Sequence, residues 1–92
     1  YNDNMNTLEE LRKQIDQIDA TLLHVLSNRM KLVKEIGAFK KMKGIPPLDK
    51  KRWEQVLASK LKLAQSQGLN IIFIRKIYEL LHEQALLIEQ KS

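Results

Sequence analysis

The stretch TLEELRKQIDQIDATLLHVLSNRMKLVKEIGAFKKMKG, residues 7–44, decides the fold. Thr7, followed three residues later by Glu10, fits a capping box, the pattern that begins many helices. Neither a proline nor a loop signal follows until Gly44, which offers a helix end. Apolar residues recur in steps of three and four, as on one face of a helix: Leu8, Leu11, Ile15, Ile18, Leu22 and Leu26. The pattern predicts one helix from about residue 7 to about residue 43.

This first helix is too long for a compact single chain. At 1.5 Å per residue it spans roughly 55 Å, whereas a compact chain of 92 residues is only about 30 to 35 Å across. The remaining residues cannot cover so long an apolar stripe, so a partner chain must cover part of it. We therefore expect an intertwined oligomer, most simply a two-fold homodimer.

Two further helices are predicted after the segment 44–48, whose glycine and two prolines are typical of a loop. Asp49 is a natural N-cap for a second helix that ends near Gly68, and Asn70 caps a third. Their apolar faces are Trp53, Val56, Leu57, Leu61 and Ala64, then Ile74, Ile77, Tyr78, Leu81, Ala85 and Ile88. Without strand alternation or repeats, the expected fold is all-α, with one long, one short and one medium helix. We expect a single domain over residues 5–92, with residues 1–4 a tail or a cloning remnant.

The composition narrows the function. The chain has no cysteine, which excludes disulfides and thiolate chemistry and suits a cytoplasmic location. No apolar run approaches the roughly 20 residues of a membrane span, and no signal peptide is visible. The net charge of +5 favours an anionic partner. Aromatics are only 5%, however, and the cations are spread along the helices and intermixed with acids, which disfavours nucleic acid as that partner. Neither a phosphate loop nor a metal-ligand spacing is present, so we expect no cofactor and no metal.

Two cations interrupt the apolar stripe of the first helix. Counting by threes and fours from Leu26 gives Arg29, Val33, Ile36 and Lys40. A cation in such a place must snorkel to water, find a carboxylate or face a polar cavity. Snorkelling is the usual outcome for a lysine near a helix end. For Arg29 the rival to a ligand is a structural ion pair, with these candidate partners: Asp16, Asp19 and Glu35.

Other polar residues lie at the edge of the same faces. They are Arg12 in the first helix, Asp49 and Arg52 in the first turn of the second, and Glu89 in the third. Such a set describes a polar pocket inside a helix bundle. The excess of guanidinium groups favours a ligand with carboxylates or phosphates, which the planar fork binds with two hydrogen bonds. Without a nucleophile, the pocket fits catalysis by positioning and electrostatics, or binding alone.

Three stretches resemble the all-helical class of chorismate mutase, over nearly the whole chain: LRKQIDQIDATLLHVLSNRMKLVKEIGAFK, PPLDKKRWEQVL and IRKIYELLHEQALLIEQ. Members of this class are intertwined homodimers that convert chorismate to prephenate in phenylalanine and tyrosine biosynthesis, without a cofactor. By this resemblance Arg29 and Lys40 hold the substrate carboxylates and the breaking ether oxygen. Arg12 reaches into the partner subunit's site. Arg52 is a further site cation, and Asp49 lies near the ring hydroxyl.

The chain departs from the bacterial pattern at three site positions. Glu89 stands where a glutamine usually donates to the ether oxygen. A carboxylate there repels the developing charge unless it is protonated, so we expect catalysis to improve toward acid pH. Trp53 replaces a common glutamate, and Ala85 replaces a common serine that can bind a substrate carboxylate.

These departures leave other functions open. An isochorismate-pyruvate lyase or an aminodeoxychorismate mutase would use the same cationic scaffold. From a different class, the chain could be a helical dimerisation or regulatory module without chemistry. Several assigned residues also have purely structural interpretations: Asp49 as an N-cap, Arg12 as the partner of Asp16, and Trp53 as a core aromatic.

Overall fold

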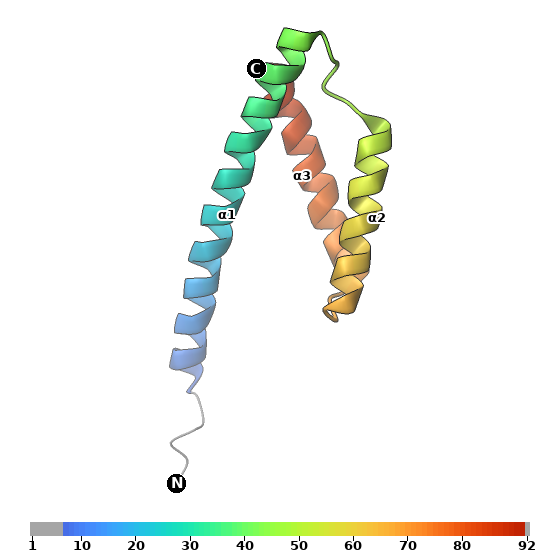
Figure 1. The fold of residues 1–92 in the computed structure, drawn as a ribbon. Coiled ribbons are helices and arrows are strands. Elements are labelled where there is room, and N and C mark those ends of the chain that lie inside the picture. The colour runs from blue at the N-terminus through green and yellow to red at the C-terminus, as the bar shows by residue number, and fades with distance from the viewer. Residues whose placement is uncertain (1–6, 92) are drawn as a thin grey trace. The chain divides into compact units, whose positions relative to one another are not determined.

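The computed structural model describes residues 7–91 and consists of three α-helices (Figure 1). They are α1 (Leu8–Lys43), α2 (Lys50–Ser66) and α3 (Ile71–Lys91). The predicted all-α fold and the order of a long, a short and a medium helix are confirmed. Within the described residues, no helix has the length and apolar character needed to cross a membrane. The prediction for residues 1–4 lies outside the described part of the chain.

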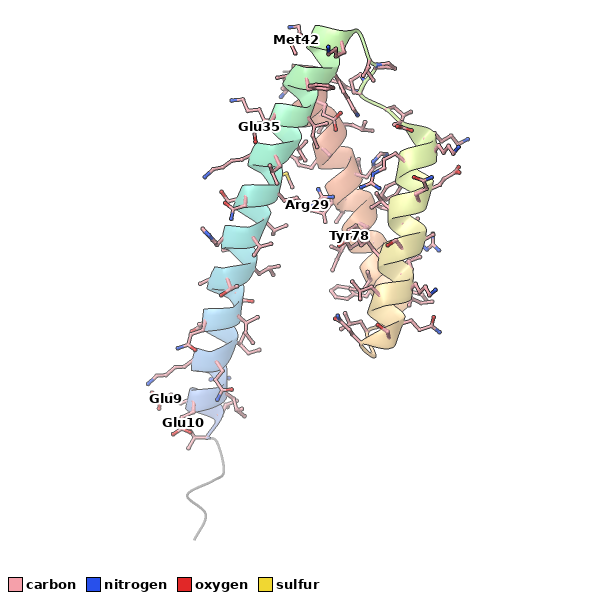
Figure 2. The ribbon with its side chains drawn as sticks, in the orientation of Figure 1. Glu9, Glu10, Arg29, Glu35, Met42 and Tyr78 are labelled. Atoms are coloured by element: carbon pink, nitrogen blue, oxygen red, sulfur yellow. The ribbon has the colours of Figure 1, made fainter. Side chains whose placement is uncertain are left out.

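The helices begin at the predicted caps. Thr7 Oγ1 accepts the Glu10 N–H at 3.1 Å, and Asp49 Oδ1 accepts the Arg52 N–H at 3.0 Å. Asn70 Oδ1 accepts two backbone N–H groups of the first turn of α3, at 2.9 and 3.1 Å. Each cap satisfies donors that the first turn of a helix leaves unpaired. At the start of α1, the adjacent Glu9 and Glu10 also complement the helix dipole (Figure 2).

Glycines end the first two helices in the same way. Gly44 and Gly68 have positive φ angles of 69° and 73°, which side chains with a Cβ rarely adopt. After α1, the Ile45 N–H reaches back to the Lys40 carbonyl at 2.8 Å, and after α2 the Leu69 N–H reaches Ala64 at 3.0 Å. These are Schellman motifs, in which a left-handed residue turns the chain out of the helix.

The chain divides into two compact units, residues 1–31 and 32–92. In the described part of the first unit, the predicted apolar stripe is in water. Its exposed fractions run from 45% at Leu11 to 62% at Ile18, and the stripe also includes Leu8, Ile15 and Leu22. No residue of this segment that the structure describes is fully buried. The unit therefore lacks a core of its own.

The second unit contains the last turns of α1 together with α2 and α3. The latter two helices run antiparallel and pack side by side (Figure 1). Val33, Gly37 and Ala64 are buried, and the predicted apolar faces of α2 and α3 are at least partly buried. Ile36 is 48% exposed in the single chain, so Gly37 and not Ile36 is the buried residue between Val33 and Lys40. Gly37 takes its place on the stripe because the helix steps by four and then three residues, from Val33 to Gly37 to Lys40.

Candidate functional site

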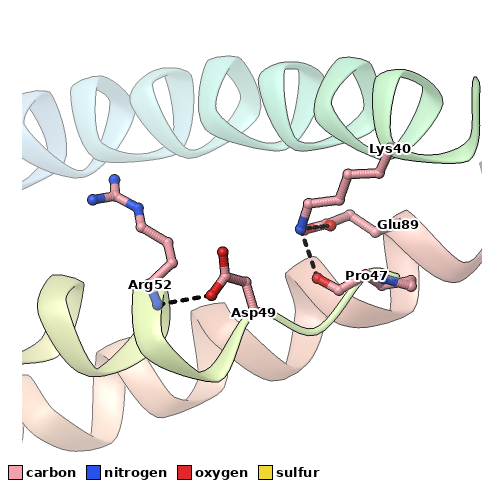
Figure 3. Close-up of polar contacts among 5 residues, drawn as sticks. All are labelled: Lys40, Pro47, Asp49, Arg52 and Glu89. Atoms are coloured by element: carbon pink, nitrogen blue, oxygen red, sulfur yellow. Dashed lines mark hydrogen bonds and ion pairs between the residues drawn. The ribbon is translucent and has the colours of Figure 1, made fainter. Parts of the chain in front are cut away.

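Lys40, in the last turn of α1, directs its ammonium group to two acceptors (Figure 3). Its Nζ lies 2.6 Å from Glu89 Oε1 on α3 and 2.6 Å from the Pro47 carbonyl oxygen in the loop. The two side chains are largely withdrawn from water, with 19% of Lys40 and 9% of Glu89 exposed. Lys40 therefore does not snorkel. It joins α1, the loop 44–49 and α3 at one point.

A cavity of about 320 Å³ adjoins this ion pair. Its lining consists of Gly37, Lys40, Lys41, Ile45, Pro47, Glu89 and Gln90. The volume is at the lower end of small-molecule sites, which run from roughly 300 to 1,000 Å³. An ammonium group has three N–H donors, and two are used by Glu89 and Pro47. One donor of Lys40 is thus left for a ligand.

Two polar residues of this cavity were not among the predicted site residues. Gln90 follows Glu89 directly, and one helical step of about 100° argued against a shared site. Glu89 and Gln90 nevertheless both line the cavity. Lys41 also lines it, although Gln90 and Lys41 are otherwise exposed. The sequence signal for Lys41 is its place beside Lys40, but a pair of lysines at a helix end is also common on plain surfaces.

Asp49 and Arg52 occupy the start of α2, where Asp49 is the N-cap (Figure 3). The structural interpretation of Asp49 is therefore confirmed, while its role toward a substrate stays a prediction. Both residues are exposed, and no contact with Lys40 or Glu89 is recorded for them among residues 7–91. Ala85 is half-buried and precedes Glu89 by four residues, so both are on one face of α3.

The other two predicted cations, Arg12 and Arg29, belong to the first unit. Arg12 is exposed, and the described residues show no ion pair between it and Asp16. Arg29 is half-buried, and its Nη1 is buried without a hydrogen-bond partner in the described part of the chain. The suggested ion pairs of Arg29 are thus not formed. A buried donor without an acceptor is rare in folded proteins and costs free energy. We therefore expect another group to supply an acceptor for Arg29 Nη1.

Trp53 stacks on His82 where α2 and α3 pack together. The ring centroids are 4.1 Å apart and the planes differ by 10°. Both rings are half-buried. The interpretation of Trp53 as a core aromatic of α2 is in keeping with this packing, which holds the two helices together one turn beyond Asp49. No cluster of three or more metal-binding side chains occurs among the described residues.

Comparison with known proteins gives a consistent result. Residues 11–90 match the family model for chorismate mutase type II. The chorismate mutase of Methanocaldococcus jannaschii is 32% identical over 81 residues, which are 86% of this chain and 82% of that protein. A 4-amino-4-deoxychorismate mutase of Streptomyces pristinaespiralis is 31% identical over 72 residues, 78% of this chain and 56% of that protein. The T-protein of Enterobacter agglomerans is 40% identical over 62 residues, 67% of this chain but only 17% of its own length. Some relatives are therefore much longer than this chain.

Proposed function

The chain belongs to the chorismate mutase type II family, and we propose that it is an enzyme that rearranges chorismate to prephenate. The observation that carries the proposal is Lys40, held by two acceptors at the edge of a ligand-sized cavity with one donor to spare. This is the residue that the family resemblance assigns to the ether oxygen. We place the reaction in phenylalanine and tyrosine synthesis in the cytoplasm, with residues 5–92 as one domain, and expect no cofactor.

The rearrangement needs positioning and charge rather than a nucleophile. One C–O bond of the enolpyruvyl ether breaks while one C–C bond forms, and negative charge gathers on the ether oxygen. A fixed donor at that oxygen stabilises the transition state more than the ground state, because the charge develops only there. Lys40 is already oriented by Glu89 and Pro47, so little reorganisation opposes the reaction. Cations that bind both carboxylates also hold chorismate in its folded, reactive conformer. The conformational entropy is then lost on binding and not in the chemical step, which lowers the barrier.

Arg29 is proposed to bind a substrate carboxylate. Its buried Nη1 lacks an acceptor among the described residues, and a carboxylate oxygen is the strongest acceptor available for a guanidinium group. Arg52 and Asp49 on α2 and Ala85 on α3 are further residues that we propose to bind the substrate. Arg52 uses only its backbone N–H in the contact with Asp49, so its guanidinium group remains available (Figure 3).

We further propose a homodimer in which Arg12 completes the partner subunit's site. The support is the apolar stripe of residues 8–22, whose large side chains are about half exposed in the single chain. Such an exposed apolar stripe becomes buried when a helix of a second chain packs against it. Arg12 lies beside this stripe, next to Leu8 and Ile15, and is exposed. A chain that covers the stripe thus also comes close to Arg12.

Glu89 is proposed to act in its protonated form. As a carboxylate it neutralises Lys40 at 2.6 Å and would repel the charge that develops on the ether oxygen. Protonation removes that repulsion, returns the full positive charge to Lys40 and gives Glu89 a hydrogen to donate. The proposed enzyme is therefore more active toward acid pH.

A second candidate is the mutase reaction on 4-amino-4-deoxychorismate. Relatives with that name include the Streptomyces protein, which matches 78% of this chain. Trp53, stacked on His82, stands where the family pattern has an acid near the ring hydroxyl. Asp49 would then be the acid that remains to contact an amino group at that ring position.

The test is to incubate the purified protein with chorismate, with 4-amino-4-deoxychorismate and with isochorismate, and to identify the products between pH 5 and 8. Prephenate as the main product supports the proposal, and its amino analogue supports the second candidate. Release of pyruvate from isochorismate would instead indicate a lyase. A folded protein that leaves all three substrates unchanged would contradict the enzymatic proposals and leave the regulatory module.

A further inference from the structure

The cavity beside Lys40 has an unusual distribution of charge. Three charged residues line it, Lys40, Lys41 and Glu89. Lys40 and Glu89 neutralise each other because their charged atoms are only 2.6 Å apart. The remaining net charge of the lining, one positive unit, is that of Lys41. An anionic ligand that approaches this cavity is therefore attracted mainly by Lys41 while Glu89 is ionised.

Lys41 is free to make that contact. It lies in the last turn of α1, it is exposed, and no side-chain acceptor is recorded for it among residues 7–91. Gly37 precedes it by four residues, so the two share one face of the helix. Gly37 is buried, lines the same cavity and has no side chain that could block the lysine.

The neighbouring Lys43 provides a contrast. It belongs to the same helical turn and has the same charge, but it does not line the cavity. Its Nζ instead lies over the ring of Phe39, 5.9 Å from the ring centroid, within the range of a cation–π contact. The last turn of α1 thus places one cation at the cavity and another on an aromatic ring.

We propose that Lys41 is a further substrate-binding residue, which gives a ligand carboxylate the positive charge that Glu89 neutralises on Lys40. The identity of the ligand rests on the proposed function, whereas the role of Lys41 requires only an anion in this cavity. Gln90, across the same lining, adds an amide that can donate or accept without changing the charge. Because Lys41 contacts a carboxylate away from the reacting bond, it contributes to binding and not to the chemical step.

The experiment compares Lys41→Gln, Lys41→Arg and Lys43→Gln with the wild type in chorismate turnover at pH 7, at low and at physiological ionic strength. Both glutamine variants lose one positive charge from the same turn, so general effects of net charge are matched. Circular dichroism checks that each variant keeps its helices. We expect Lys41→Gln to raise KM about 5-fold at low salt with kcat nearly unchanged, because an exposed ion pair is lost. The increase should shrink at physiological salt, where the screening length is about 8 Å.

Lys41→Arg should keep the KM of the wild type, and Lys43→Gln should stay within about 2-fold of it. Equal KM values for Lys41→Gln and Lys43→Gln would overturn the assignment even if the wild type is an active mutase. If the wild type binds chorismate in calorimetry without converting it, the proposed function fails, and the same comparison is made on Kd. A wild type that neither binds nor converts chorismate would overturn both proposals.

Discussion

The two parts of α1 carry the same apolar spacing but differ in what their own chain provides. In residues 8–22 the large apolar side chains of the stripe are exposed, whereas Val33 and Gly37 in the later part are buried. The two cations of the stripe, Lys40 and Arg29, also differ in whether their own chain provides hydrogen-bond acceptors. Lys40 has two acceptors at 2.6 Å, while Arg29 Nη1 is buried with none among the described residues. In the later part, some of the stripe is buried and Lys40 is paired within one chain; in the earlier part, neither is true of the described residues.

Lys40 and Arg29 therefore differ in what each would gain from a ligand. Lys40 is held before any ligand arrives, so its position is fixed and its charge is partly neutralised. The unpaired nitrogen of Arg29 gains a hydrogen bond only when something else supplies an acceptor. A ligand carboxylate at Arg29 thus relieves an existing cost, whereas a ligand at Lys40 must share the ammonium group with Glu89.

The largest expected effect comes from the earlier part of α1. Ile18→Asp places a charge in the exposed stripe, and if a second chain covers that stripe, the substitution buries an unpaired carboxylate. We expect loss of the dimer, a fall of at least about 3 kcal/mol in the free energy of unfolding, and loss of turnover. Sedimentation measures the mass, and denaturant titration followed by circular dichroism measures stability.

The matched control for Ile18→Asp is Ala20→Asp. Ala20 is exposed and lies about 200° around the helix from both Ile18 and Leu22, on the opposite face. This substitution introduces the same charge into the same helix. It should keep the mass of the wild type and lower the free energy of unfolding by no more than about 1 kcal/mol, the helix-propensity cost of aspartate. If Ile18→Asp behaves like Ala20→Asp, the stripe faces water in solution and the contrast between the two parts of α1 has no functional meaning.

The second prediction concerns the later part. Lys40→Ala removes the donor proposed for the ether oxygen, and we expect kcat to fall about 10²- to 10³-fold, as when a single oxyanion-hole donor is removed. Lys43→Ala removes a lysine of the same helical turn that lies outside the cavity, and should leave kcat within about 2-fold. Near-normal turnover of a folded Lys40→Ala protein would show that Lys40 serves only to join α1, the loop and α3.

The helix boundaries could be predicted because their signals are local. Thr7, Asp49 and Asn70 cap with their own side chains, and Gly44 and Gly68 adopt the positive φ angles that end α1 and α2. The shift from Ile36 to Gly37 on the stripe was missed because steps of three and four both fit helical periodicity. Only packing decides between them.

The site was less accessible to sequence reasoning. Periodicity singled out Lys40 as a cation on an apolar stripe and placed Glu89 at the edge of another apolar face. Because the two residues are 49 positions apart, no sequence pattern predicted that they form an ion pair. The bond to the Pro47 carbonyl depends on the path of the loop backbone, which no side-chain pattern encodes. The unpaired Nη1 of Arg29 was equally hidden, because three acids near it in sequence offered plausible partners that the structure does not use.

The smallest predicted effect tests what fixes Lys40. We expect the kcat of the wild type to rise toward acid pH, because a carboxylate at Glu89 repels the charge that develops on the ether oxygen, whereas a neutral carboxyl group donates a hydrogen to it. Glu89→Gln has a neutral donor at every pH, so its profile should be flat to within about 2-fold. Glu83→Gln is the matched control: it removes an exposed carboxylate from the same helix and should keep the wild-type profile.

A wild-type rate that instead rises with pH through 5 to 8 would reverse the interpretation of the ion pair. The ionised Glu89 would then be needed to hold Lys40 in place, and Glu89→Gln would lower kcat at every pH in that range. In that case the 2.6 Å contact between Lys40 and Glu89 is itself the active arrangement. The pH profile of the wild type, compared with the profiles of Glu89→Gln and Glu83→Gln, thus decides whether Glu89 acts as a neutral donor or as the carboxylate that holds Lys40.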